Sequence, residues 1–216
     1  MAGLYAVTPE IDDTAVLVRN VAAAIDGGAG IVQYRAKTVD AATARTQALA
    51  LAQVAAARGA LFIVNDDAQL AADVDADGVH LGDDDGSVAV VREIVGTDRL
   101  IGVSCYDDAA RAHEAVAAGA DYVAFGSFFD SPTKPAARRA ARGLLEHAVA
   151  LGVPVVAIGG ITAANARGLI DAGADAVAVI ADVFARDDPS AITQAAAAIA
   201  SQFGSPRASR AVARPA

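Results

Sequence analysis

The stretch GADYVAFG, residues 119–126, joins a glycine, a common helix stop, to a short apolar strand. Part of it recurs as ADGV at 76–79 and ADAV at 174–177, with GAGI at 28–31 as a weaker fourth copy. Before each copy comes a second type of strand: LYAVT at 4–8, LFIVN at 61–65, LIGVS at 100–104 and VVAIG at 155–159. This alternation indicates four βαβα units, and eight such parallel strands are expected to close into a single (β/α)8 TIM barrel. An open, doubly wound α/β sheet is the alternative, but it does not explain a fourfold alternation.

The predicted strands are nearly continuous apolar runs, which are typical of parallel strands covered on both faces. The alanine-rich segments between them favour helices. We expect strands at Leu4–Thr8, Ile31–Arg35, Leu61–Asn65, Gly78–Leu81, Leu100–Ser104, Tyr122–Phe125, Val155–Ile158 and Ala176–Ile180, and helices that include Ala41–Arg58, Asp108–Ala118, Ala163–Ala172 and Pro189–Gln202.

Composition limits the class of protein. The chain has 216 residues, of which 55% are hydrophobic and 20% charged, so it can bury a large core. We expect one barrel domain over 1–203, and a disordered tail at 204–216, where periodicity ends. A net charge of −9 argues against nucleic-acid binding, and no apolar run reaches membrane-spanning length. A single cysteine and no recognisable signal peptide favour the cytoplasm, and a homo-oligomer is possible.

Two aspartates stand just past neighbouring predicted strands. In a barrel of this type, chemistry belongs at the carboxyl ends of the strands, where Asp66 and Asp85 are expected. Two carboxylates with no nearby histidine or cysteine cluster suit Mg²⁺, which takes one or two carboxylates together with phosphate oxygens and water. The alternative is that Asp66 or Asp67 caps the next helix and that 83–85 is a solvated acidic turn.

Basic residues and glycines also occur at the carboxyl ends of the predicted strands. Arg35 and Lys37 alternate along an extended segment, so they are expected to point to one side, and Lys134 follows a later strand. Together they suggest a clamp for a metal-bound polyphosphate, although each alone could be an ordinary surface residue. Gly159-Gly160, followed by Thr162 as a helix cap, matches the usual phosphate site of such barrels, or else a simple turn.

Two further residues are interpreted structurally. His80 lies within an apolar strand and is expected to fill or line the barrel, because no second histidine stands at metal-ligand spacing. Cys105 has no histidine close in sequence to activate it, so we expect a packed thiol.

The chain resembles the thiamine-phosphate synthase family. The matching segments occur in the family's order and span nearly all of the chain except the tail. They are LYAVT (4–8), VQYRAK (32–37), NDD (65–67), ADGVHLGDDD (76–85), IGVS (101–104), GADYVAFG (119–126), SPTK (131–134), VAIGGI (156–161) and GADAVAVI (173–180). Departures from the family's usual pattern include Ala36 for an acidic residue, Asp83 for glutamine and Ala181 for serine.

The resemblance implies a reaction and its small-molecule partners. The family joins a hydroxymethylpyrimidine diphosphate to a thiazole phosphate, giving thiamine phosphate and diphosphate. By resemblance, the pyrimidine diphosphate would be held by Gln33, Arg35, Lys37, Asn65, Ser104 and Lys134, and the thiazole phosphate by Ser131, Thr133, Gly160, Ile180 and Ala181. Asp66 and Asp85 match the family's Mg²⁺ ligands, and the residues with catalytic roles are Arg35, Lys37, Ser104 and Lys134.

Three other functions compete with this interpretation. The related thiazole tautomerase would use a histidine near 104–106, where this chain has Ser-Cys-Tyr, and would lack the metal pair. A sugar-phosphate isomerase or aldolase would need a Schiff-base lysine or a set of metal-binding histidines at the strand ends. A non-catalytic barrel would keep the phosphate cradle without binding Mg²⁺ and diphosphate productively.

Overall fold

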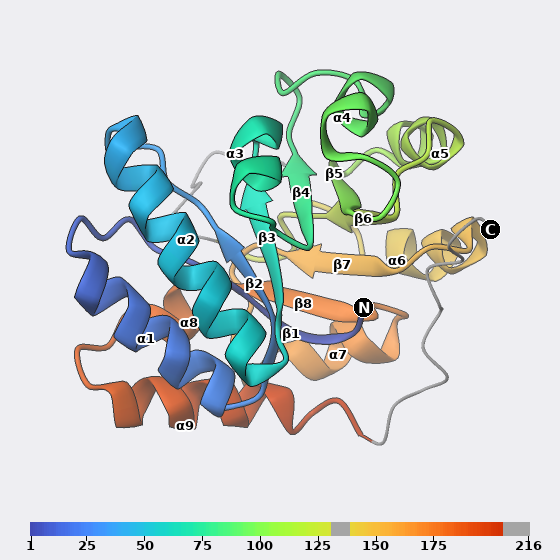
Figure 1. Ribbon diagram of the computed structural model, residues 1–216. Coiled ribbons are helices and arrows are strands. Elements are labelled where there is room, and N and C mark those ends of the chain that lie inside the picture. The colour runs from blue at the N-terminus through green and yellow to red at the C-terminus, as the bar shows by residue number, and fades with distance from the viewer. Residues whose placement is uncertain (131–138, 205–216) are drawn as a thin grey trace.

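The computed structural model describes residues 1–130 and 139–204, and within them eight parallel strands form a closed barrel in chain order (Figure 1). The barrel closes where β1 pairs with β8. The single (β/α)8 barrel is thus confirmed. The strands are β1 Gly3–Val7, β2 Ala29–Tyr34, β3 Leu61–Asn65, β4 Gly78–Leu81, β5 Leu100–Tyr106, β6 Tyr122–Phe125, β7 Val155–Ile158 and β8 Ala176–Val179.

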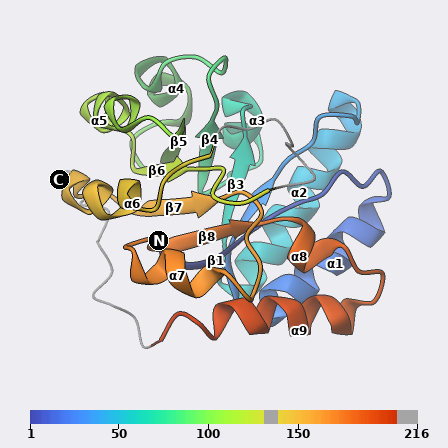
Figure 2. The same cartoon turned by 180° about the vertical axis from the view of Figure 1, so that it is seen from behind.

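Helices surround the strands, and α1 lies between α2 and α9 on one side of the barrel (Figure 1). The view from behind shows α7 and α9 below β8, with α8 beyond the end of that strand (Figure 2). The helices are α1 Thr14–Asp26, α2 Ala41–Arg58, α3 Ala68–Asp73, α4 Val88–Val95, α5 Ala109–Ala117, α6 Gly143–Ala148, the 3-10 turn η1 Val149–Leu151, α7 Ala166–Asp171, α8 Ala181–Phe184 and α9 Pro189–Ala200. No helix in the described part of the chain is long and apolar enough to span a bilayer.

Two differences from the sequence prediction concern helix starts after β7 and β8. Thr162 does not cap α7, because a turn comes first: the Thr162 backbone N–H donates to Asn165 Oδ1 at 2.8 Å, and the helix begins at Ala166. The short helix α8 was not predicted. The tail prediction for 204–216 falls almost wholly on 205–216, outside the described residues, and stays a prediction.

The repeated Ala-Asp motif has a structural explanation at the amino-terminal end of the barrel. Each aspartate precedes an even-numbered strand and pairs twice with one residue of the strand before it. The Asp121 backbone N–H donates to the Ile101 carbonyl oxygen at 2.8 Å, and its carboxylate accepts from the Ile101 N–H at 2.7 Å. The carboxylates of Asp77 and Asp175 accept from the N–H groups of Phe62 and Val155 in the same way, at 2.8 and 2.9 Å.

The weaker fourth copy differs at this position. Gly30 stands where the other copies have aspartate, and β2 carries an extra residue there, since Leu4 pairs with Ala29 and Tyr5 with Ile31. A bulge therefore replaces the carboxylate bridge.

The core has two parts. Side chains on the outer faces of the strands pack against the helices, whereas a smaller cluster inside the barrel includes Tyr5, Ile63, Tyr122 and Val156. Several inward-facing positions nearer the carboxyl ends of the strands are polar, such as Gln33 and His80, and together with apolar ones such as Val7 and Ala124 they line the site described next.

Candidate active site

A cavity of about 1230 Å³ opens at the carboxyl ends of the strands. Its wall combines inward-facing strand residues with residues of the loops that follow β2, β4, β5, β6, β7 and β8. A smaller hollow of about 500 Å³ at the opposite end of the barrel contains none of the predicted site residues. The predicted residues that line the large cavity are Gln33, Arg35, Asn65, Ser104, Gly160, Ile180 and Ala181.

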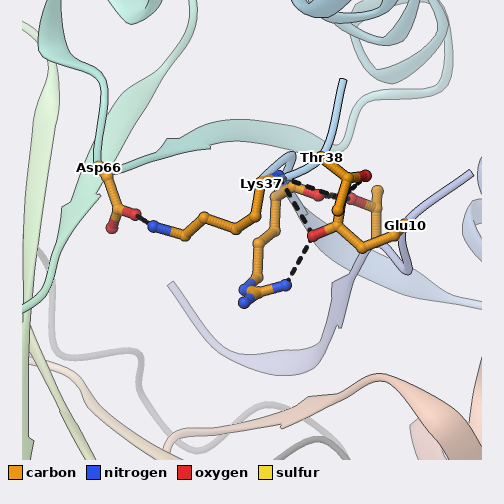
Figure 3. A network of polar contacts seen from close by, with 6 residues as sticks. Glu10, Lys37, Thr38 and Asp66 are labelled. Carbon is orange, nitrogen blue, oxygen red and sulfur yellow. Dashed lines mark hydrogen bonds and ion pairs between the residues drawn. The ribbon is translucent and has the colours of Figure 1, made fainter. Parts of the chain in front are cut away.

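Three other predicted residues lie together beside this cavity rather than in its lining. Lys37 extends its side chain to Asp66 and forms an ion pair through Nζ and Oδ2 (Figure 3). Burial raises the pKa of Asp66; the hydrogen bond from Lys37 opposes this, and the adjacent Asp85 carboxyl group raises the pKa further. Asp85 Oδ2 also accepts from the Gly82 N–H at 2.7 Å. The two carboxylates are therefore neighbours, as the sequence predicts.

The adjacent aspartates after β3 have different tasks. Asp67 is the N-cap of α3, and its carboxylate accepts from the Leu70 N–H at 2.8 Å. Asp66 has a left-handed backbone, with φ of 65°, and its side chain meets Lys37 instead of the helix. The helix-cap alternative thus holds for Asp67, whereas Asp66 pairs with Lys37 beside the cavity.

Glu10, which the sequence analysis missed, organises the segment after β2. Its carboxylate accepts from Arg35 Nη1 at 2.8 Å, from the Lys37 N–H at 3.0 Å and from Thr38 Oγ1 at 3.1 Å (Figure 3). Arg35 and Lys37 were expected to point to one side, as alternate residues of an extended segment do. Because β2 ends at Tyr34, strand geometry does not fix the directions of these two side chains. Arg35 lines the cavity, while Lys37 reaches Asp66 outside the lining. Glu10 follows β1, so its place after a strand end was the available signal.

Five polar side chains from five strands are linked inside the barrel, and all of them except Tyr122 line the cavity. Gln33 Nε2 donates to the Tyr5 hydroxyl at 2.9 Å, and the Tyr5 and Tyr122 hydroxyls are 2.9 Å apart. His80 Nδ1 lies 3.0 Å from the Tyr122 hydroxyl, and His80 Nε2 lies 2.9 Å from Ser104 Oγ. His80 therefore lines the barrel, as predicted. The two tyrosines were missed because only the closed barrel brings these strands together.

Arg111 holds the loops after β4 and β5. Its Nε donates to the Ser104 carbonyl oxygen at 2.7 Å and its Nη2 to that of Gly82 at 3.1 Å. It also forms an ion pair with Asp83 at 2.6 Å, and its guanidinium lies 5.8 Å from the centre of the Tyr106 ring. The acidic turn at 83–85 is thus only partly solvated, because Asp83 and Asp85 both have partners. No motif marked Arg111, which lies in an alanine-rich helix.

The opposite wall is formed by the loops after β6, β7 and β8. The backbone N–H of Phe129 donates to the Gly159 carbonyl oxygen at 3.0 Å, which joins two of these loops. Gly160 has φ of 63°, and a Cβ there would lie 2.2 Å from the Asp130 carbonyl oxygen, so the close approach of the loops requires glycine. Arg186 was also missed: it lines the cavity and, within the described residues, forms no ion pair with a carboxylate.

Two predicted groups remain to be placed. Ser131, Thr133 and Lys134 lie at 131–138, outside the described residues. Cys105 is fully buried in the outer core, as predicted, and burial raises the pKa of its thiol to about 12.

Comparisons with known proteins identify the family of this chain. A family model described as thiamine monophosphate synthase matches residues 4–183. A thiamine-phosphate synthase from Chromobacterium violaceum is 53% identical over 202 residues, which cover 94% of this chain and 96% of the relative. The one from Halorhodospira halophila is 54% identical over 192 residues, with coverage of 88% and 90%. A solved structure, thiamine phosphate pyrophosphorylase from Pyrococcus furiosus, is 34% identical with a TM-score of 0.82, covering 93% of this chain and 95% of that one. This chain belongs to the thiamine monophosphate synthase family.

Proposed function

We propose that this chain is a transferase that joins 4-amino-2-methyl-5-hydroxymethylpyrimidine diphosphate to thiazole phosphate, giving thiamine phosphate and diphosphate. One observation carries the proposal: a single cavity is lined on one side by Gln33, Arg35, Asn65 and Ser104 and on the other by Gly160, Ile180 and Ala181. These are the two sets assigned to the two substrates. Holding both substrates in one cavity replaces an encounter in solution by a reaction between bound partners.

The diphosphate end combines carboxylates with cations. Asp66 and Asp85 would hold Mg²⁺, and their donor chemistry fits this ion, since two neighbouring carboxylates are a common protein contribution to a phosphate-bound Mg²⁺. Within the described residues no group of three potential ligands gathers, but Mg²⁺ does not need a third. When bound, the ion neutralises charge on the diphosphate oxygens. Arg35, Lys37 and Lys134 supply further positive charge, and the Ser104 hydroxyl donates to a diphosphate oxygen.

The bond change follows from this charge distribution. The C–O bond breaks with its electron pair leaving on the diphosphate, and a carbocation forms on the pyrimidine methylene carbon, stabilised by the electron-rich aminopyrimidine. The thiazole nitrogen then donates its lone pair to that carbon. The protein contributes position and charge, without a nucleophilic side chain. Apolar residues such as Val7, Ala124 and Val156 in the lining would keep water from the cation.

The thiazole phosphate would bind at the opposite wall. The backbone of Gly160 and of Ile180–Ala181, with the hydroxyls of Ser131 and Thr133, would hold its phosphate. Ala181 offers no hydroxyl, and Arg186 in the same wall can supply a cation instead. The cytoplasm remains the expected compartment.

A product assay tests the proposal. Purified protein is mixed with both substrates and Mg²⁺, and thiamine phosphate and diphosphate are measured by mass spectrometry and by diphosphate release. We expect equimolar products that depend on Mg²⁺ and disappear with a chelator. Binding of the thiazole phosphate without product would instead indicate a non-catalytic barrel, and isomerisation of the thiazole carboxylate alone would indicate a tautomerase.

A further inference from the structure

Five polar side chains at the bottom of the cavity, four of them buried and Ser104 half-buried, form one continuous chain of hydrogen bonds. It runs from Gln33 on β2 through Tyr5 on β1, Tyr122 on β6 and His80 on β4 to Ser104 on β5. Its four donor–acceptor distances lie between 2.9 and 3.0 Å. Both ends of the chain are residues assigned to the pyrimidine diphosphate, whereas its three middle members have no assigned task.

Counting protons gives this chain a direction. The amide nitrogen of Gln33 can only donate, so the Tyr5 oxygen accepts and the single Tyr5 hydroxyl proton goes to the Tyr122 oxygen. The Tyr122 proton then goes to His80 Nδ1, so the histidine carries its proton on Nε2. In the reverse direction, within the described residues, the Tyr5 proton would have no acceptor.

The Nε2 proton determines what Ser104 does. His80 Nε2 donates to Ser104 Oγ, and the serine's own proton is then free for an acceptor in the cavity, which Ser104 lines. With the other histidine tautomer, Ser104 would donate to Nε2 and offer a ligand no proton. Burial raises the pKa of both tyrosines, so both keep the protons that the chain requires.

Packing holds the central member of the chain in place. A Cβ on residue 102 would lie 1.9 Å from Cζ of Tyr122, so Gly102 on β5 leaves the space that the ring fills. The Tyr122 ring stacks on His80 with centroids 5.5 Å apart and meets Tyr5 edge-on at 6.3 Å. The packed ring therefore fixes the position of the Tyr122 hydroxyl.

We propose that Tyr5, Tyr122 and His80 are positioning residues that fix the Ser104 hydroxyl as a donor to the diphosphate. They do so because each of them donates its proton to the next member of the hydrogen-bond chain, which begins at the Gln33 amide. The identity of the Ser104 acceptor rests on the proposed function. The direction of the hydrogen-bond chain does not depend on that function.

The tautomer can be measured directly, without substrate. Protein labelled with ¹⁵N-histidine contains three histidines, and the His113→Gln and His147→Gln variants assign the other two signal sets. We expect His80 to show the neutral form protonated at Nε2. His147 gives the contrasting reference, since its Nδ1 lies 2.6 Å from the Gly143 carbonyl oxygen, which can only accept. A His80 protonated at Nδ1, or at both nitrogens, overturns the proposal.

Tyr122→Phe removes one oxygen and keeps the ring. We expect its His80 signals to shift toward a mixture of tautomers and kcat to fall about tenfold, with KM for the thiazole phosphate unchanged, since one directed hydrogen bond to a charged ligand is lost. Tyr34→Phe is the matched control: the Tyr34 hydroxyl is also buried and donates to Gln47 Oε1 at 2.8 Å, outside this chain. It should leave the His80 signals and kcat unchanged.

The outcomes separate the parts of the proposal. Unchanged His80 signals in Tyr122→Phe refute the chain, and changed signals with unchanged kcat refute its effect on Ser104. If the protein forms no thiamine phosphate at all, the proposed function fails while the histidine signals still decide the direction of the chain. Tyr5→Phe breaks the preceding link and serves as a second variant if Tyr122→Phe does not fold.

Discussion

Asp121 and Asp66 are carboxylates at opposite ends of the same barrel, and they differ in what they bind. At the amino-terminal end, Asp121 accepts from the Ile101 N–H and pairs with Arg92 at 2.6 Å. At the carboxyl-terminal end, Asp66 meets the Lys37 ammonium and lies beside Asp85. The first carboxylate binds a backbone N–H and an arginine, whereas the second binds a lysine and lies beside another carboxylate.

This difference shows how to separate structural from functional aspartates. The Asp121 carboxylate closes a strand pair through a fixed backbone N–H, and Arg92 balances its charge. Two like charges held together are unfavourable until a cation joins them. A second carboxylate at close range, and not the presence or absence of a backbone hydrogen bond, therefore distinguishes the two tasks, since Asp85 also accepts from the Gly82 N–H.

The largest effect is expected for Asp66→Asn. Asparagine tolerates the left-handed backbone at this position, so the fold should persist while one metal-binding charge is lost. We expect kcat/KM with Mg²⁺ to fall at least about 100-fold, because metal stabilisation of a leaving group contributes several kcal/mol. Asp67→Ala is the neighbouring control: it should lower the free energy of unfolding by about 1 kcal/mol and keep the activity. Full activity of Asp66→Asn at low Mg²⁺ would show that the metal assignment is wrong.

Asp121→Ala should give the opposite result. The Ile101 N–H and Arg92 lose their acceptor, and we expect the free energy of unfolding to drop by about 1–3 kcal/mol, measured by urea denaturation. Activity per folded molecule at 20 °C should not change. Asp121→Asn keeps an acceptor oxygen and should cost less. A loss of activity without a loss of stability would contradict the structural assignment.

Glu10 is an intermediate case that sharpens the rule. It lies at the carboxyl-terminal end but binds a backbone N–H and an arginine, as Asp121 does. We therefore expect Glu10→Ala to act through Arg35, raising KM for the pyrimidine diphosphate about five- to tenfold with a smaller change in kcat, since one charged hydrogen bond is released. Glu10→Gln should restore part of the affinity. A change confined to the KM for thiazole phosphate would exclude this role.

The smallest effect is expected from thiol-alkylating reagents. Cys105 lies between two cavity-lining residues, but its side chain faces the outer core and its pKa is raised to about 12 by burial. At pH 8 the thiolate is therefore a minute fraction, and iodoacetamide should leave the native protein unmodified and active. Mass spectrometry should find one alkylated cysteine after unfolding in urea. Rapid labelling of the native state would mean that the Cys105 side chain faces the cavity and not the outer core.

The repeated strands and the residues at their ends could be predicted from the sequence, whereas contacts between residues far apart in the sequence could not. Several strands match the expected bounds, including Leu61–Asn65 and Tyr122–Phe125, because parallel strands carry a strong local apolar pattern. Asp66 and Asp85 were found because the barrel places strand ends together. The link from Arg111 to Gly82 and the Tyr5–Tyr122 contact could not be found, because they join residues 29 and 117 positions apart and no local pattern marks them.

The closure of the barrel has a consequence for synthesis of the protein. β1 is synthesised before the other seven strands of the barrel, yet one of its two edges pairs with Ala176–Val179, and α1 packs on α9. For most of translation, that edge has no native neighbour, and the ring is completed only when the last strand arrives. Chaperones that shield exposed strand edges would therefore act on β1, and a circular permutation that opens the barrel between two other strands should change folding speed more than final stability.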